Sequence, residues 1–133
     1  MWPTAPRQRA LVDQWTEWTQ TTFQPAWLGL FWSFFRTAPQ DRDPAAIQRA
    51  LEATQRCFAI MEAQLGSGPF LAGDQLTYAD IVAGVAMFRL TTMGMDLAVP
   101  QNVTAWHARL SERQAFRVAI NVDFEELRGR RAF

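Results

Sequence analysis

The chain has 133 residues, of which 49% are hydrophobic and 20% are charged, and its 13 basic and 13 acidic residues cancel. This balance predicts one globular domain over residues 1–133 and excludes a disordered chain or a basic surface for nucleic acid. All the basic residues are Arg, which excludes a Schiff-base lysine and the lysine of a phosphate-binding loop.

The cysteine content and the apolar stretches bear on the compartment. Cys57 is the only cysteine, so no internal disulfide can form, and we expect a cytoplasmic protein. Residues 1–7 lack the basic and apolar regions of a signal peptide. The most apolar stretch, residues 23–35, is too short to cross a bilayer, which requires about 20 apolar residues. We therefore expect no membrane partner.

The first helical region is predicted over residues 6–36, where large apolar side chains recur at helical spacing. Pro25 lies in the middle of this region. Because proline lacks an N–H and its ring clashes with the preceding turn, it should bend or interrupt the helix. The prediction is a long, kinked first helix.

The second helix is predicted to begin with Asp43 as N-cap and Pro44 as first helical residue, and to end at Gly66. Its apolar positions alternate in steps of four and three residues: Ile47, Leu51, Thr54, Phe58, Met61 and Leu65. A neighbouring stripe of small residues broadens the apolar face. We therefore expect this helix near the middle of a bundle.

The third helix has the most specific start signal in the chain. Thr77 as N-cap can accept from the backbone of Asp80, while the Asp80 carboxylate reaches back to the Thr77 N–H. Leu76 and Ile81 flank this capping box as the two ends of a hydrophobic staple. The helix should continue to about Thr92.

The remaining pattern predicts two short helices and a polar tail. Asn102 should cap a helix that carries Trp106, and a second short helix should cover residues 114–120. The tail that ends at Phe133 is polar and should be frayed. Since no strand pattern appears, the fold class is all-α, with about five to six helices.

Three segments carry a resemblance to a known family. Residues 73–81 (GDQLTYADI) resemble the capping box at the start of helix six in glutathione S-transferases. Residues 102–117 (NVTAWHARLSERQAFR) are similar to a later segment of that domain, with Gln114 in place of the usual proline. Residues 6–18 (PRQRALVDQWTEW) resemble the opening of helix four in bacterial members. The chain is therefore identified as a glutathione S-transferase C-terminal-like helical bundle.

The resemblance implies a site for an apolar electrophile. The family's helix four forms the wall of this site, and the corresponding residues here are Gln24, Trp27, Leu28 and Phe31. Ordinary core packing or dimer contact is the alternative for each of them. Gln20, Thr21 and Asp13 should lie nearer to glutathione or the partner subunit, although for Asp13 a carboxylate on a solvated helix face is the favoured alternative.

The chain contains no residue that we assign as catalytic. His107 is the sole histidine and lacks a second ligand nearby, so a packing role is favoured over a metal ligand or a general base. Cys57 lies on a helix stripe as a small core residue. Neither a metal nor a bound cofactor is expected, and glutathione would be a co-substrate.

Two functional hypotheses follow from the resemblance. In the first, the chain is the electrophile-binding half of a detoxifying transferase and forms a homodimer through residues 23–35. The family's thiol-activating residue belongs to a thioredoxin-like domain, which this sequence lacks, so the chain alone should be inactive. In the second, the chain is a non-catalytic interaction module, the role that this type of domain has in elongation-factor subunits.

Overall fold

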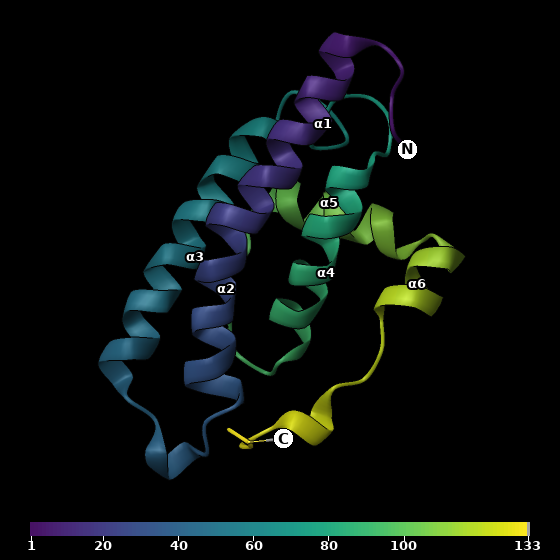
Figure 1. Cartoon of the computed structure of the whole chain (residues 1–133). Coiled ribbons are helices and arrows are strands. Elements are labelled where there is room, and N and C mark those ends of the chain that lie inside the picture. The colour runs from purple at the N-terminus through teal and green to yellow at the C-terminus, as the bar shows by residue number, and fades with distance from the viewer. Residues whose placement is uncertain (133) are drawn as a thin grey trace.

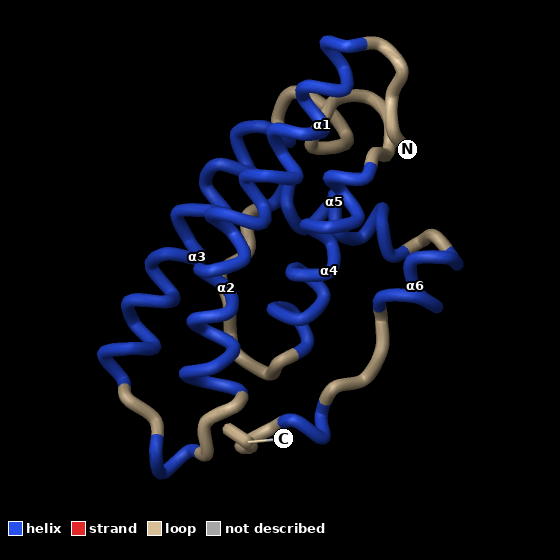
Figure 2. Tube along the Cα trace, in the orientation of Figure 1, coloured by secondary structure: helices blue, strands red, loops and turns tan. Residues whose placement is uncertain are grey.

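The computed structural model describes residues 1–132, and all of their regular structure is helical (Figure 2). The α-helices are α1 (Pro6–Trp18), α2 (Gln24–Leu30), α3 (Pro44–Leu65), α4 (Tyr78–Thr92), α5 (Gln101–Ser111) and α6 (Gln114–Ile120). Within residues 1–132 the only β-type pairing is an isolated bridge between Phe70 and Gly73. The predicted all-α class is confirmed, and none of the described helices is long and apolar enough to cross a membrane.

Pro25 does not interrupt the first helical region. The backbone stays helical from α1 through α2, with wide π-helical turns at Thr19–Phe23 and Phe31–Phe35. In the first of these turns the Gln24 N–H donates to the Thr19 carbonyl, five residues earlier. The wide turn places the proline at the start of α2, where its missing N–H costs little.

The helices form a bundle with α4 at its centre (Figure 1). We call the continuous helical segment of residues 6–35 the α1–α2 rod. It runs down one side of the bundle, α3 returns beside it, and α4 then runs down the middle. Helix α4 contacts α1, α2, α5 and α6. The expectation that residues 44–65 occupy the middle was wrong, because α3 leaves Ile60 46% exposed on its outer face.

Small residues let the neighbours of α4 approach closely. Ala79, Ala83, Gly84 and Ala86 are all buried. A Cβ atom added at Gly84 would lie 2.8 Å from Leu110 Cδ1 and 2.9 Å from the Phe116 ring. Gly84 is therefore the point at which α5 and α6 both press against the central helix.

Helix α5 begins two residues earlier than predicted and is capped by a distant side chain. Its N-cap is Pro100, which provides no side-chain cap, so Asn102 does not cap the helix. The carboxylate of Glu62, on α3, accepts hydrogen bonds from the N–H groups of Asn102 (2.9 Å) and Val103 (3.1 Å). An acidic group from another helix thus satisfies the free donors at the α5 N-terminus.

The tail is packed rather than frayed. We call residues 121–130 the C-terminal strap, and it returns from α6 to the lower end of the bundle (Figure 1). Its Phe124 is only 8% exposed. The Gly129 N–H donates to the Phe35 carbonyl at 2.9 Å. The polar composition of the strap hid these contacts, and Phe133 lies outside the described residues.

Candidate functional site

The Thr77–Asp80 capping box lies at the start of α4, and its carboxylate also binds groups outside this helix. Asp80 is fully buried. Its Oδ2 accepts from the Thr77 N–H at 2.8 Å and from the Thr77 hydroxyl at 2.9 Å. Its Oδ1 accepts from the Leu71 N–H at 2.8 Å and from Trp106 Nε1 at 3.0 Å. These four donors offset the cost of burying a carboxylate and join the preceding loop, α4 and α5.

Leu76 and Ile81 flank the capping box at the edge of the core. Both side chains are half-buried and pack against buried residues. Both also line an apolar groove of about 310 Å³ beside α6, together with Met1, Phe116 and Ile120. The two ends of the predicted staple therefore lie on one concave surface.

The four predicted wall residues occupy one stretch of the α1–α2 rod, but they differ in exposure. Trp27 and Phe31 are each 5% exposed, and their ring centroids lie 5.7 Å apart in an edge-to-face arrangement. Gln24 and Leu28 are half-exposed. In this structure, then, only Gln24 and Leu28 present much surface to a ligand, while the two aromatic residues belong to the core.

The residues expected near glutathione lie on the outside of the rod. Asp13, Gln20 and Thr21 are all exposed. The Thr21 hydroxyl donates to the Glu17 carbonyl at 2.7 Å, a contact within the helix. None of these three side chains lines either of the two clefts described in this section.

The apolar stretch at residues 23–35 contributes mainly to the core of its own chain. Its fully buried side chains are Phe23, Leu30 and Phe35. Trp32 remains 37% exposed, and Phe34 is half-exposed. Little of this segment is therefore free for a second subunit.

A cluster of aromatic rings at the lower end of the rod was missed by the sequence reasoning. The Phe124 ring lies 5.9 Å from Phe31, 5.1 Å from Phe35 and 6.1 Å from Phe88, measured between centroids. The strap thus covers Phe31, one of the predicted wall residues. The signal in the sequence was Phe124, the one aromatic residue among residues 121–130.

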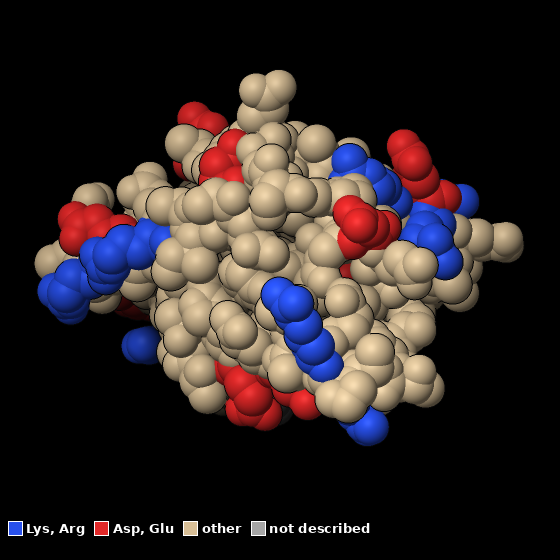
Figure 3. Space-filling view, turned by 90° about the horizontal axis from the view of Figure 1, so that it is seen from above, with Lys and Arg blue, Asp and Glu red and all other residues tan. Residues whose placement is uncertain are grey.

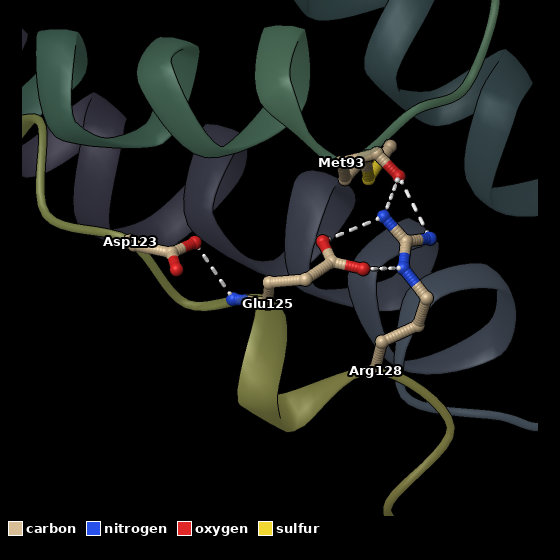
Figure 4. A network of polar contacts seen from close by, with 4 residues as sticks. All are labelled: Met93, Asp123, Glu125 and Arg128. Carbon is tan, nitrogen blue, oxygen red and sulfur yellow. Dashed lines mark hydrogen bonds and ion pairs between the residues drawn. The ribbon is translucent and has the colours of Figure 1, made fainter.

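Arg128 holds the strap in place (Figure 4). Its guanidinium donates to the Met93 carbonyl at 3.2 Å and pairs with Glu125. This ion pair lowers the pKa of Glu125 and raises that of Arg128. The Arg128 Cζ atom also lies 4.4 Å from the centroid of the Phe35 ring.

A second cleft of about 470 Å³ lies at the opposite end of the molecule, where α1 begins. It is lined by Met1, Trp2, Pro3, Thr4, Ala5, Gln8, Asp74, Gln75, Leu76 and Thr77. Figure 3 views the molecule from this end, and acidic and basic side chains are interspersed on the face it shows. Neither this cleft nor the groove beside α6 contains a predicted wall residue.

Cys57 and His107 are both in packed surroundings. Burial raises the pKa of the Cys57 thiol, which is 3% exposed. Burial lowers the pKa of His107, whose ring lies 6.3 Å from Phe116. Among residues 1–132, no group of three or more His, Cys, Asp or Glu side chains is arranged to hold a metal ion.

The chain is similar in sequence to the C-terminal domain of glutathione S-transferases and to proteins that contain such a domain. Residues 44–109 match the family model described as glutathione S-transferase, C-terminal domain. The chain is 28% identical over 122 residues to glutathione S-transferase GstB of Escherichia coli, a match that covers 92% of this chain and 59% of GstB. It is 34% identical over 109 residues to the disulfide-bond oxidoreductase YfcG of the same organism, covering 82% of this chain and 50% of YfcG.

Solved structures show the same similarity. The theta class glutathione S-transferase of Xanthomonas axonopodis pv. citri superposes with a TM-score of 0.88 at 33% identity, over 92% of this chain and 64% of that chain. Its glutathione-bound form gives a TM-score of 0.87. The chain thus spans about three fifths of the length of GstB and of this transferase.

Proposed function

Because this chain belongs to the glutathione S-transferase C-terminal domain family, we propose that it is the helical part of a glutathione transferase and supplies the wall against which an electrophile binds. The observation that carries the proposal is the similarity of nearly the whole helical fold to a transferase whose structure holds glutathione. Within that fold, Gln24 and Leu28 are the wall residues with exposed surface. In this proposal glutathione is a co-substrate, and the chain's role is to bind an apolar partner for it.

The residues of this chain favour a role in binding the electrophile and not in activating the glutathione thiol. Cys57, the sole cysteine, is buried, and its raised pKa disfavours the thiolate that a nucleophile requires. We therefore propose that these 133 residues alone do not activate glutathione. A free, buried cysteine also suits the reducing cytoplasm, where conjugation of electrophiles would serve detoxification.

An activity assay tests this proposal. The purified chain is incubated with glutathione and 1-chloro-2,4-dinitrobenzene, and conjugate formation is followed by absorbance. We expect the rate to equal that of the uncatalysed reaction. Catalysis clearly above that rate would contradict the proposal that these residues are inactive alone.

A binding assay tests the wall itself. Binding of 1-chloro-2,4-dinitrobenzene is measured by equilibrium dialysis, without glutathione. Leu28→Ser should weaken binding several-fold because it removes apolar contact area at the wall. Val118→Ser, on α6 at a 74% exposed position, serves as the matched control and should have no effect. Equal behaviour of the two variants would argue against a wall on α2.

We propose in addition that the chain forms a homodimer, as expected from the resemblance. Exposed apolar side chains on α1, on the second π-helical turn and on α3 support this: Leu11, Trp32 and Ile60. Light scattering tests the point, with Ile60→Asp as the disrupting variant. A clean monomer at high concentration would contradict the proposal.

An assembly role without catalysis is the second candidate, and the apolar groove beside α6 is the observation that favours it. Val118, on α6, and Val122, two residues after its end, are also 74% and 60% exposed. A protein partner captured by the chain should then be lost with Ala119→Asp in the groove and retained with Leu28→Ser. The opposite pattern would favour the transferase role.

A further inference from the structure

Helix α2 lies between two π-helical turns. The Gln24 N–H closes the first turn on the Thr19 carbonyl, and the Arg36 N–H closes the second on the Phe31 carbonyl at 2.9 Å. Single π-helical turns are rare, and within α-helices they occur frequently at functional sites. The two turns therefore single out α2, which is seven residues long, as the part of the α1–α2 rod where a ligand contact is expected.

Gln24 and Leu28 present a polar group and an apolar surface side by side on α2. They lie four residues apart, so they are neighbours on the same face of the helix. Both side chains are half-exposed. Among residues 1–132 the Gln24 amide makes no hydrogen bond, so its N–H donors and its carbonyl oxygen are available to a ligand.

No other polar side chain of α2 is accessible in this way. Gln24 and Trp27 carry the only polar side-chain groups of the helix. Trp27 Nε1 is buried in the core, where a ligand on the surface of the rod does not reach it. In the turns on either side, the Thr21 and Ser33 hydroxyls already donate to carbonyls of the rod, each at 2.7 Å. Gln24 is therefore the donor that α2 presents beside Leu28.

The chemistry of thiolate addition calls for such a donor. When a thiolate attacks a conjugated ketone, a sulfur–carbon bond forms at the β-carbon and the electron pair of the double bond shifts toward the carbonyl oxygen. The oxygen carries the negative charge as an enolate until a proton from water completes the addition at the α-carbon. A hydrogen-bond donor placed at this oxygen binds the transition state more strongly than the ground state. An amide N–H can fill this role, since it is a neutral donor that remains available at every pH at which the fold is stable.

We propose that Gln24 is the specificity-determining residue of the electrophile wall, and that its amide N–H donates to a carbonyl or nitro oxygen of a ligand whose apolar body lies on Leu28. The chain thereby selects electrophiles that are activated by a conjugated oxygen over those that lack one. The inference rests on the proposed wall, since Leu28 belongs to both. It adds the class of electrophile and the polar contact that orients it.

Two ligands of the same shape test the oxygen requirement in the full chain. One is 4-phenyl-3-buten-2-one, and the other is 3-methyl-1-phenyl-1,3-butadiene, in which a methylene group replaces the carbonyl oxygen. Binding of each is measured by equilibrium dialysis without glutathione. Gln24→Met keeps the length of the side chain and removes its donors, so it should weaken binding of the ketone about three- to tenfold. Binding of the hydrocarbon should be unchanged, which also shows that the variant keeps its fold.

Two further variants test whether the donor is the group that matters. Gln24→Glu keeps acceptor oxygens at this position but has no N–H, so it should weaken binding of the ketone at least as much as Gln24→Met. Gln14→Met, at an exposed position on α1, is the matched control and should change neither ligand. Equal losses of both ligands with Gln24→Met, or undiminished ketone binding by either Gln24 variant, would overturn the proposal.

Leu28→Ser in the same titrations separates this inference from the electrophile wall itself. If Leu28→Ser weakens both ligands and Gln24→Met has no selective effect on the ketone, the wall is supported and the role of Gln24 is contradicted. If Leu28→Ser weakens neither ligand while Gln24→Met still weakens the ketone alone, the contact with the oxygen is supported and the apolar wall is contradicted.

Discussion

Trp106 Nε1 donates a hydrogen bond of 3.0 Å to the carboxylate of Asp80, and both residues are fully buried. Trp106 lies on α5 and Asp80 lies in the first turn of α4. The contact therefore extends a local capping box into a tertiary link between two helices. Among residues 1–132, it is one of two donors to the Asp80 Oδ1 atom.

Replacing Trp106 should cost more than replacing a second buried tryptophan. Trp106→Phe leaves a buried carboxylate short of a donor, whereas Trp27 Nε1 has no hydrogen-bond partner to lose. The reduction in side-chain volume is the same in Trp27→Phe. We expect Trp106→Phe to lower the free energy of unfolding by about 1.5 to 3 kcal/mol more than Trp27→Phe. Urea unfolding measures both, and equal losses would show that the indole contact contributes nothing.

Gly84 should not tolerate a side chain. Gly84→Ala places a Cβ atom within 3 Å of Leu110 and Phe116, two buried side chains, so overpacking should cost about 1 to 3 kcal/mol. Gly29→Ala is the matched control on α2, where the added Cβ atom meets Ala50 Cβ at 3.4 Å. That variant should gain up to about 1 kcal/mol from helix propensity. Similar melting temperatures for the two variants would contradict this account.

The sequence was informative where a structural feature depends on neighbouring residues. Thr77 and Asp80 lie three positions apart, so the capping box was predicted from their spacing alone, as was the start of α3 at Asp43 and Pro44. The hydrogen bond from Trp106 to Asp80 was not predictable in this way. Trp106 is 26 residues away from Asp80, and only the folded arrangement brings them together.

The features that the sequence did not predict also depend on more than the spacing of neighbouring residues. Pro25 was expected to bend or interrupt a helix; the chain does not leave the helical conformation there, but a π-helical turn over Thr19–Phe23 precedes the proline, and no residue pattern signals such a turn. The strap was expected to fray because its composition is polar, yet Phe124 and Gly129 fix it to distant residues. For the candidate site, the sequence indicated Phe31 through resemblance and missed the ring that covers it.

Glu62 should stabilise α5 although it belongs to α3. Because α5 has no cap of its own, Glu62→Ala leaves the N–H groups of Asn102 and Val103 without acceptors. We expect a loss of about 1 to 2 kcal/mol in the free energy of unfolding. Glu52→Ala removes only an exposed contact with Gln48 within the same helix, so it should change stability by less than about 0.5 kcal/mol. Equal effects in urea unfolding would rule out the capping role.

His107 should make the fold less stable in mild acid. Burial lowers the pKa of His107 in the folded state, whereas the unfolded chain has a histidine pKa of about 6.5. Its Nε2 atom is buried without a hydrogen-bond partner among the described residues, so the fold offers the extra proton no acceptor. Between these two pKa values the unfolded state binds more protons, and the free energy of unfolding must fall as the pH falls below about 7.

His107→Gln removes this group and should flatten the pH dependence between about pH 7 and 5. Other carboxylates, including Glu125 with its lowered pKa, titrate alike in both proteins, so their contribution cancels in the comparison. Urea unfolding at a series of pH values gives the two curves. If the wild type and the variant lose stability in parallel, His107 is not the group responsible, and its packing against Phe116 does not exclude the charged form.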